Sequence, residues 1–204
     1  MDLAETSRRG NLEALGNIAE RQEGYFSAAQ AAAAGIERHR LQRLVGQGVI
    51  ERDERGIYRF AVYPHGDRAE LWRAVLWPSI QRGILTGILS HGTALSLHEV
   101  STVNPATVDL SIPRSLRLRR GVPPAYRIRR HDLDPGEVTN LHGLPLTTLF
   151  RTLFDLIVGG EHLQFVAEAL EEAPRRGLLT VEEAKHLRAL SAVDPSLLQK
   201  AAHA

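Results

Sequence analysis

Apolar and polar residues between positions 11 and 60 are spaced as in three consecutive helices followed by a hairpin. Apolar residues from Leu12 to Ala19 recur at helical intervals, which predicts a first helix with one buried face. Ser27 and Gln30 then form the pattern of an N-terminal capping box. Alanines fill the following residues up to Gly35, so we expect a short second helix there.

The stretch GIERHRLQRLVGQGVIERDERGIYRF, residues 35–60, contains the third helix and the hairpin. On a helix over residues 37–47, the apolar side chains Leu41, Leu44 and Val45 fall on one side. The segment VIERDERGIYRF reads as strand, turn and strand. Two helices joined by a tight glycine turn and followed by a hairpin predict a winged helix-turn-helix.

The second half of the chain has mixed helix and strand patterns. A helix is expected from Ser90 to His98, and ATVDLSIP alternates as a strand. SLRLRRGVPPAYRIRRHDL predicts two strands around a Gly-Pro-Pro turn, and three helices follow from about Thr147. We therefore expect an α+β protein with a winged helix-turn-helix domain at residues 1–65. A mixed α/β domain with a small sheet is expected at residues 66–204, after a linker near residues 61–68.

Composition limits the class of protein. The chain has 204 residues, a formal net charge of +1 and no cysteine, which fits a cytoplasmic protein without disulfides. No apolar run approaches the roughly 20 residues that cross a bilayer, and the N-terminus lacks the apolar segment of a signal peptide. We therefore expect no membrane partner. Among the 25 basic residues only Lys185 and Lys200 are lysines, and arginine is the better fork for phosphate and guanine.

Polar residues of the third helix and the hairpin are the candidates for DNA binding. Side chains opposite the apolar stripe could reach base edges, and flanking or hairpin arginines could contact phosphates. The predicted DNA-binding residues are Ser27, Arg38, His39, Arg40, Gln42, Arg43, Gln47, Arg52, Arg55 and Arg59. An ordinary solvated amphipathic helix is the alternative, since residues 36–59 contain four acids beside six basic residues.

A second arginine cluster lies in the predicted strands of the second half. Leucines alternate with arginines there, which predicts an arginine face over an apolar face. The cluster contains no acid and consists of Arg114, Arg117, Arg119, Arg120, Arg127, Arg129 and Arg130. Three hypotheses remain open, namely a solvated sheet face, a second DNA-contacting surface, and a surface for a toxin or RNA.

Enzyme signatures are absent from the sequence. There is no phosphate-binding loop with lysine, no nucleophile elbow and no cysteine nucleophile. His91 and His98 are two helical turns apart, a spacing that favours packing or hydrogen-bonding histidines over a metal site. Arg151 and Asp155 could pair along one helix. We expect no catalytic residue, metal or cofactor. Two alternatives stay open: an unorthodox enzyme that modifies a toxin, and a protein-interaction or RNA-binding module.

Several segments together resemble one family. Residues 24–60 look like the N-terminal winged helix of AbiEi-type antitoxins of type IV toxin–antitoxin systems, and ILSHGTALSLHEVS, VDLSIPR and GLPLTTLFRTLFDLI are similar to landmarks of that family's C-terminal half. The resemblance implies an autorepressor that binds inverted repeats in its own promoter. It also implies a partner toxin of nucleotidyltransferase type. Related winged helices occur on larger proteins with a nuclease-like extension, and we expect this chain to lack that extension. Two copies of the chain could form a dimer on DNA.

Overall fold

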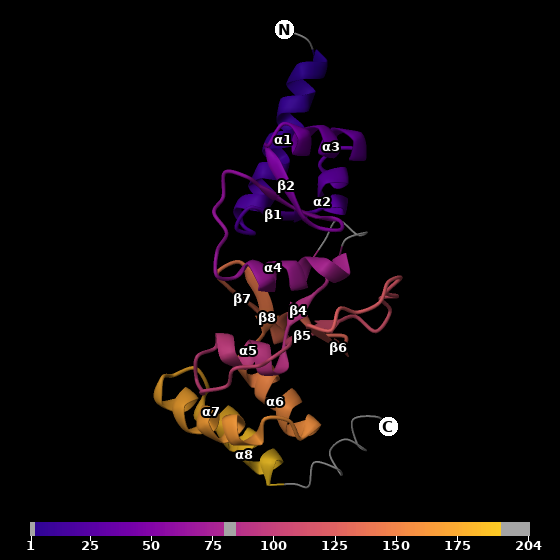
Figure 1. The fold of residues 1–204 in the computed structure, drawn as a ribbon. Helices are drawn as coiled ribbons and strands as arrows, with labels where there is room; N and C mark the ends of the chain where they lie inside the picture. Colours follow the sequence, from indigo (N-terminus) through magenta and orange to yellow (C-terminus); the bar gives the residue numbers. More distant parts are fainter. Residues whose placement is uncertain (1–2, 80–84, 193–204) are drawn as a thin grey trace. The chain divides into compact units, whose positions relative to one another are not determined.

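The computed structural model describes residues 3–79 and 85–192, which form two compact units (Figure 1). The first comprises Met1–Gly87 with His142–Leu144, and the second comprises Ile88–Leu141 with Pro145–Ala204. The sequence placed a domain boundary near residue 65. The first unit reaches further because Trp72 is fully buried and Arg73 pairs with Asp53 of the hairpin. No helix in the described ranges is long and apolar enough to cross a membrane.

The first unit is a winged helix. Its described elements are α1 (Leu3–Glu20), β1 (Tyr25–Ser27), α2 (Ala28–Ala33), α3 (Arg38–Gly46), β2 (Ile50–Glu54), β3 (Ile57–Phe60), α4 (Ala69–Leu76) and the 3₁₀ turn η1 (Trp77–Ser79). The three strands form an antiparallel sheet in the order β1-β3-β2. The β2–β3 hairpin turns at Arg55 and Gly56, and its register shifts between Arg52 and Glu54.

The core of the first unit confirms the predicted apolar faces. Leu15 and Ala19 of α1, Leu41 and Leu44 of α3, and Ile36 before α3 are buried together. Phe26 and Phe60 add ring contacts from the sheet, with centroids 5.3 Å apart. Burial of these side chains holds α3 by its apolar stripe and leaves its opposite face outward.

The second unit is a five-stranded sheet with a helical layer. Its elements are β4 (Ile88–Leu89), α5 (His91–Leu97), β5 (Val108–Ile112), β6 (Tyr126–Arg130), the 3₁₀ turn η2 (Pro135–Glu137), β7 (Val138–Leu141), β8 (Leu144–Thr147), α6 (Leu149–Gly159), α7 (Leu163–Arg175) and α8 (Val181–Ser191). The strand order is β6-β5-β4-β8-β7, with β5 parallel to β6 and antiparallel to β4. The expectation of an α+β protein is confirmed.

Apolar faces of α5 to α8 form the larger core of this unit. Leu153 and Leu156 of α6 are fully buried among residues of the other three helices. The Thr148 hydroxyl accepts a hydrogen bond from the Arg151 N–H, which caps α6 at its start. Gly160 ends the helix in a left-handed conformation, with φ of +65°. Helix α6 is therefore fixed at both ends, and this places Arg151 and Asp155 on defined turns.

One local prediction was wrong, and one strand was missed. Residues 25–27 form strand β1, which the alanine-rich pattern after them concealed. Residues 115–120 are irregular and form no strand, so the expected pair of strands around Gly-Pro-Pro is absent there. The strand predicted from the alternating segment ATVDLSIP is confirmed as β5, and all five of its residues are buried.

Candidate nucleic-acid interface

The outward face of α3 gathers most of the side chains that the sequence predicted for DNA contact. His39, Gln42 and Arg43 are exposed and lie opposite the buried Leu41 and Leu44. The same exposed class includes Arg38 and Gln47, whereas Arg40 is half-buried. A glycine lies in a turn on each side of α3. Gly35 and Gly48 have φ of +75° and +69°, a left-handed conformation that glycine adopts readily, and these turns set the direction of the helix.

A surface hollow of about 230 Å³ lies beside the first half of α3. The side chain of Asn11 from α1 donates to the carbonyl of Gly35 at 3.1 Å, which ties the turn before α3 to the first helix. The hollow is lined by Asn11, Gly35, Glu37, His39, Arg40 and Arg43. Donors of Asn11 and Arg43 therefore face the same open space as the helix start.

Acids near this face are mostly engaged elsewhere, which bears on the solvated-helix alternative. Glu51 pairs with Arg59 at 2.5 Å, and Asp53 pairs with Arg73 of α4 at 3.4 Å. Glu54 also lies 3.8 Å from Arg73. Glu37 is the N-cap residue directly before α3, and its carboxylate lies 3.2 Å from Nδ1 of His39.

Two exposed arginines of α3 make no ion pair with any acid in the described part of the chain. Within the described residues, Arg38 and Arg43 make no ion pair. Arg52 in the hairpin is likewise exposed and without an ion pair among those residues, and Arg55 is exposed but has a polar contact. The face thus combines unpaired guanidinium groups with amide and imidazole groups.

Arg59 was predicted as a DNA contact, and the structure corrects this. Its side chain is 4% exposed, and its guanidinium donates to the carbonyl of Tyr63 and to the Glu51 carboxylate. His65 Nε2 lies 2.9 Å from the same guanidinium. Arg59 sits on β3 between β1 and β2, so it fastens the chain after the hairpin rather than facing solvent.

Ser27 requires the same correction. It is fully buried, and its hydroxyl accepts the Gln30 backbone N–H at 3.1 Å. Gln30 returns the contact through its side-chain oxygen, which accepts the Ser27 N–H at 2.9 Å. The predicted capping box is confirmed, and it occupies the hydroxyl that we had included among the DNA contacts.

The arginine cluster of the second unit divides into two groups. Arg127 and Arg129, on β6, pair with Glu161 at 3.1 and 2.5 Å and lie 3.9 and 3.6 Å from Asp109. Asp109 is buried on β5, and burial raises the pKa of its carboxyl against the opposing arginine charges. These two arginines are neutralised within the unit.

The other group consists of arginines at the surface. The connection between β5 and β6 carries three exposed arginines, Arg114, Arg117 and Arg119. It also carries Arg120, which is half-buried and makes a polar contact. Arg130 is exposed at the end of β6. No ion pair joins Arg117 or Arg119 to an acid within the described ranges. The predicted arginine face is therefore smaller than the sequence suggested.

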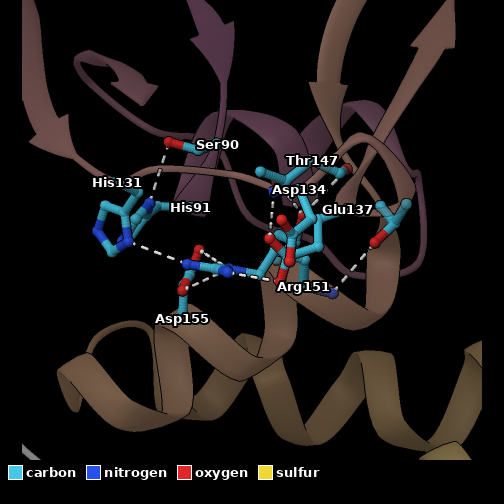
Figure 2. A network of polar contacts seen from close by, with 10 residues as sticks. Ser90, His91, His131, Asp134, Glu137, Thr147, Arg151 and Asp155 are labelled. Carbon is cyan, nitrogen blue, oxygen red and sulfur yellow. Dashed lines mark hydrogen bonds and ion pairs between the residues drawn. The ribbon is translucent and has the colours of Figure 1, made fainter. Parts of the chain in front are cut away.

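A buried network around Arg151 was only partly visible in the sequence. Figure 2 shows its guanidinium between three partners. Nε lies 2.9 Å from both carboxylate oxygens of Asp155, and Nη1 lies 2.6 Å from Glu137. Nη2 donates to Nδ1 of His131 at 3.0 Å. The pair of Arg151 and Asp155 was predicted; Glu137 and His131 come from the η2 region, and no spacing connected them to α6.

His91 lies at the far end of this network. Its ring is 5.9 Å from that of His131, and its Nδ1 is 3.0 Å from the Ser90 hydroxyl (Figure 2). Burial, with the nearby charges of Arg129 and Arg151, lowers the pKa of His91 to about 3. His98 donates from Nε2 to the Thr147 carbonyl at 2.9 Å. The default expectation of packing and hydrogen-bonding histidines is confirmed.

Comparison with known families identifies a match within the first unit. Residues 13–61 match the model of a family described as a transcriptional regulator, AbiEi antitoxin. The matched segment runs from α1 through β3 and contains the whole outward face of α3. It covers about a quarter of the chain, and within it the resemblance to AbiEi antitoxins is confirmed. No curated protein matches the chain.

Proposed function

We propose that the protein is a DNA-binding antitoxin regulator that represses its own operon through the outward face of α3. The observation that carries this proposal is the set of unpaired donors on that face, with Arg38 and Arg43 exposed and free of acid partners among the described residues. Guanidinium groups can fork to guanine, and a glutamine such as Gln42 can pair with adenine.

The acids of the hairpin form ion pairs with arginines outside α3, and this favours DNA binding over a merely solvated helix. The solvated-helix alternative depends on the four acids of residues 36–59, which would offset the basic residues of α3. Here Arg59 and Arg73 take Glu51, Asp53 and Glu54, so the hairpin acids do not neutralise α3. Phosphates are the natural counter-charges for the basic residues that remain.

The matched family extends the proposal to the second unit. Its description as an antitoxin implies that this chain counters a toxin, which we propose to be of nucleotidyltransferase type and encoded beside it. Inverted repeats in the promoter of the operon would be the DNA target, and two copies could occupy the two halves of such a repeat.

Fluorescence anisotropy with the duplex immediately upstream of the gene tests the proposal. We expect that duplex to bind on the order of 10³-fold more tightly than a scrambled one. Arg43→Ala should weaken binding to the native duplex by about 1–3 kcal/mol because a base contact is lost. The scrambled duplex should lose much less.

Arg175→Ala is the matched control, since it removes an exposed arginine on α7 in the other unit. It should leave the preference for the native duplex intact. Equal weak binding of both duplexes by the unmodified chain would contradict a specific repressor. Equal losses on both duplexes in Arg43→Ala would contradict base reading by that residue.

A further inference from the structure

The connection between β5 and β6 carries arginines that the second unit does not neutralise. It joins two neighbouring parallel strands through residues 113–125 without a helix. Its sequence, PRSLRLRRGVPPA, contains four arginines and no acid. The connection leaves the sheet beside the edge strand β6 (Figure 1). Guanidinium groups at Arg117 and Arg119 reach solvent with no partner in the described chain.

The base of this connection is fixed to the sheet. Arg130 donates from Nη1 to the carbonyl of Leu116 at 2.8 Å and to that of Arg114 at 3.4 Å. The Arg114 N–H donates to the carboxylate of Asp132 at 3.0 Å, and the Leu116 side chain is buried. The backbone at Arg114 and Leu116 is therefore held, and Arg117 and Arg119 follow directly after this supported segment.

We propose that this segment, the arginine loop of residues 114–120, contacts the phosphate backbone of duplex DNA. The inference rests on the proposed function, since it assigns a second contact to the same DNA. The loop would add affinity without reading bases, because phosphate contacts position a protein but carry no sequence information. Arginine is suited to this role through its fixed fork of donors.

The chemistry of the loop favours duplex phosphate over two other macromolecules. Single-stranded RNA is usually held by aromatic side chains on which bases stack, and residues 113–125 contain no aromatic residue. A protein interface has an apolar or aromatic centre from which charges are depleted. The connection at residues 113–125 offers only Val122, at 43% exposure, as a large exposed hydrophobic residue. A row of arginines without an apolar or aromatic centre is better suited to the phosphate backbone of duplex DNA.

The salt dependence of binding separates phosphate contacts from base contacts. Each neutralised phosphate contributes about 0.9 to the slope of the logarithm of the association constant against the logarithm of salt concentration. The double variant Arg117→Ala/Arg119→Ala should therefore reduce that slope by about 1.8. Between 50 and 200 mM salt the variant should lose about tenfold less affinity than the unmodified chain. Its preference for the native duplex over the scrambled one should not change.

The matched control removes two positive charges elsewhere on the same unit. Arg175 and Lys185 are exposed on α7 and α8, and the double variant Arg175→Ala/Lys185→Ala has the same net charge as the loop variant. It should keep the original slope. Far-ultraviolet circular dichroism of both variants checks that the fold is retained.

Four outcomes would overturn the inference. An unchanged slope in the loop variant, beside weakened binding in Arg43→Ala, would sink the loop contact alone and leave the proposed function standing. An equal fall in slope for the control would show that net charge, not the loop, is responsible. Failure of the unmodified chain to bind its duplex would remove both proposals. Loss of toxin neutralisation with unchanged DNA binding would assign the loop to an acidic protein surface.

Discussion

Arg43 of α3 and Arg151 of α6 represent opposite uses of the same side chain. Arg43 is exposed and has no ion pair within the described residues, whereas the side chain of Arg151 is 15% exposed and surrounded by Asp155, Glu137 and His131. Both lie on amphipathic helices with an apolar stripe behind them. Partners, rather than the residue type or its density, separate an arginine that is available to a ligand from a structural one.

The same contrast runs through the hairpin and the sheet. Arg52 and Arg59 are on adjacent strands of the hairpin, yet only Arg52 faces solvent. Arg117 and Arg127 belong to one cluster in the sequence, yet only Arg127 has acids beside it. A dense run of arginines therefore overstates the charge available to a ligand when acids from distant segments meet it in the fold.

Arg151→Ala should lower the free energy of unfolding more than any other variant proposed, and it sharpens the comparison between Arg151 and Arg43 most. Removal of the guanidinium leaves the buried carboxylate of Asp155 without its cation, which costs about 3–5 kcal/mol. Arg43→Ala should change stability by less than about 0.5 kcal/mol, since its side chain is exposed. Urea unfolding followed by circular dichroism measures the difference, and amide hydrogen exchange in α6 locates it.

Arg151→Met/Asp155→Leu is the companion variant. It replaces the pair by apolar side chains, so most of the lost stability should return. The comparison would break if Arg151→Ala left exchange in α6 unchanged but weakened DNA binding as much as Arg43→Ala.

His91 gives the second unit a stability that depends on pH. Its pKa in the fold, about 3, is below the ordinary value of 6.5, so the unfolded chain takes up this proton first. The free energy of unfolding should therefore fall as pH drops from about 6.5 towards 3, by at most about 1.4 kcal/mol per pH unit for this group. Burial lowers the pKa of His98 and His131 too, which adds to the fall. The raised pKa values of Asp109 and Asp155 oppose it at the acidic end.

His91→Asn tests this dependence. Residue 91 has φ of +48°, a conformation that asparagine tolerates better than most residues. The variant should flatten the decline of stability between pH 6.5 and 5, as read from hydrogen exchange in β5 and α6. An unchanged slope, with stability lowered equally at every pH, would mean that His91 contributes packing alone.

Ser27→Ala should have the smallest effect of the three. The substitution removes the hydroxyl that caps α2 and should cost about 1 kcal/mol in urea unfolding. The preference for the native duplex should stay as in the unmodified chain. A weakened preference without a loss of stability would return Ser27 to the set of DNA contacts.

Sequence patterns predicted the first unit well because its signals are local. The apolar stripe of α3, the capping box at Ser27 and the hairpin turn, which was predicted at Asp53–Gly56 and lies at Arg55 and Gly56, each depend on residues close in the chain. The family match at residues 13–61 covers the same region. The outward face of α3 followed directly from helical geometry, although the exclusion of Arg59 required knowledge of what packs on β3.

The second unit was harder because its key contacts are distant in the chain. Alternating leucine and arginine at residues 115–120 suggested a strand, but Leu116 is buried within an irregular segment. The guanidinium of Arg130 supplies donors to two carbonyls there, where a neighbouring strand would have supplied N–H groups. Nothing in the spacing of Glu137, His131 and Arg151 shows that one guanidinium joins all three.

Both tryptophans of the chain belong to the first unit. Trp72 is fully buried in α4 and Trp77 is nearly so in η1. Indole emission shifts with the polarity around the ring, so the intact protein carries an indole label in the winged helix and none in the five-stranded unit. A denaturation curve recorded from indole fluorescence is thus a measurement of one half of the molecule, and its separation from a curve recorded by circular dichroism would show that the two halves unfold independently.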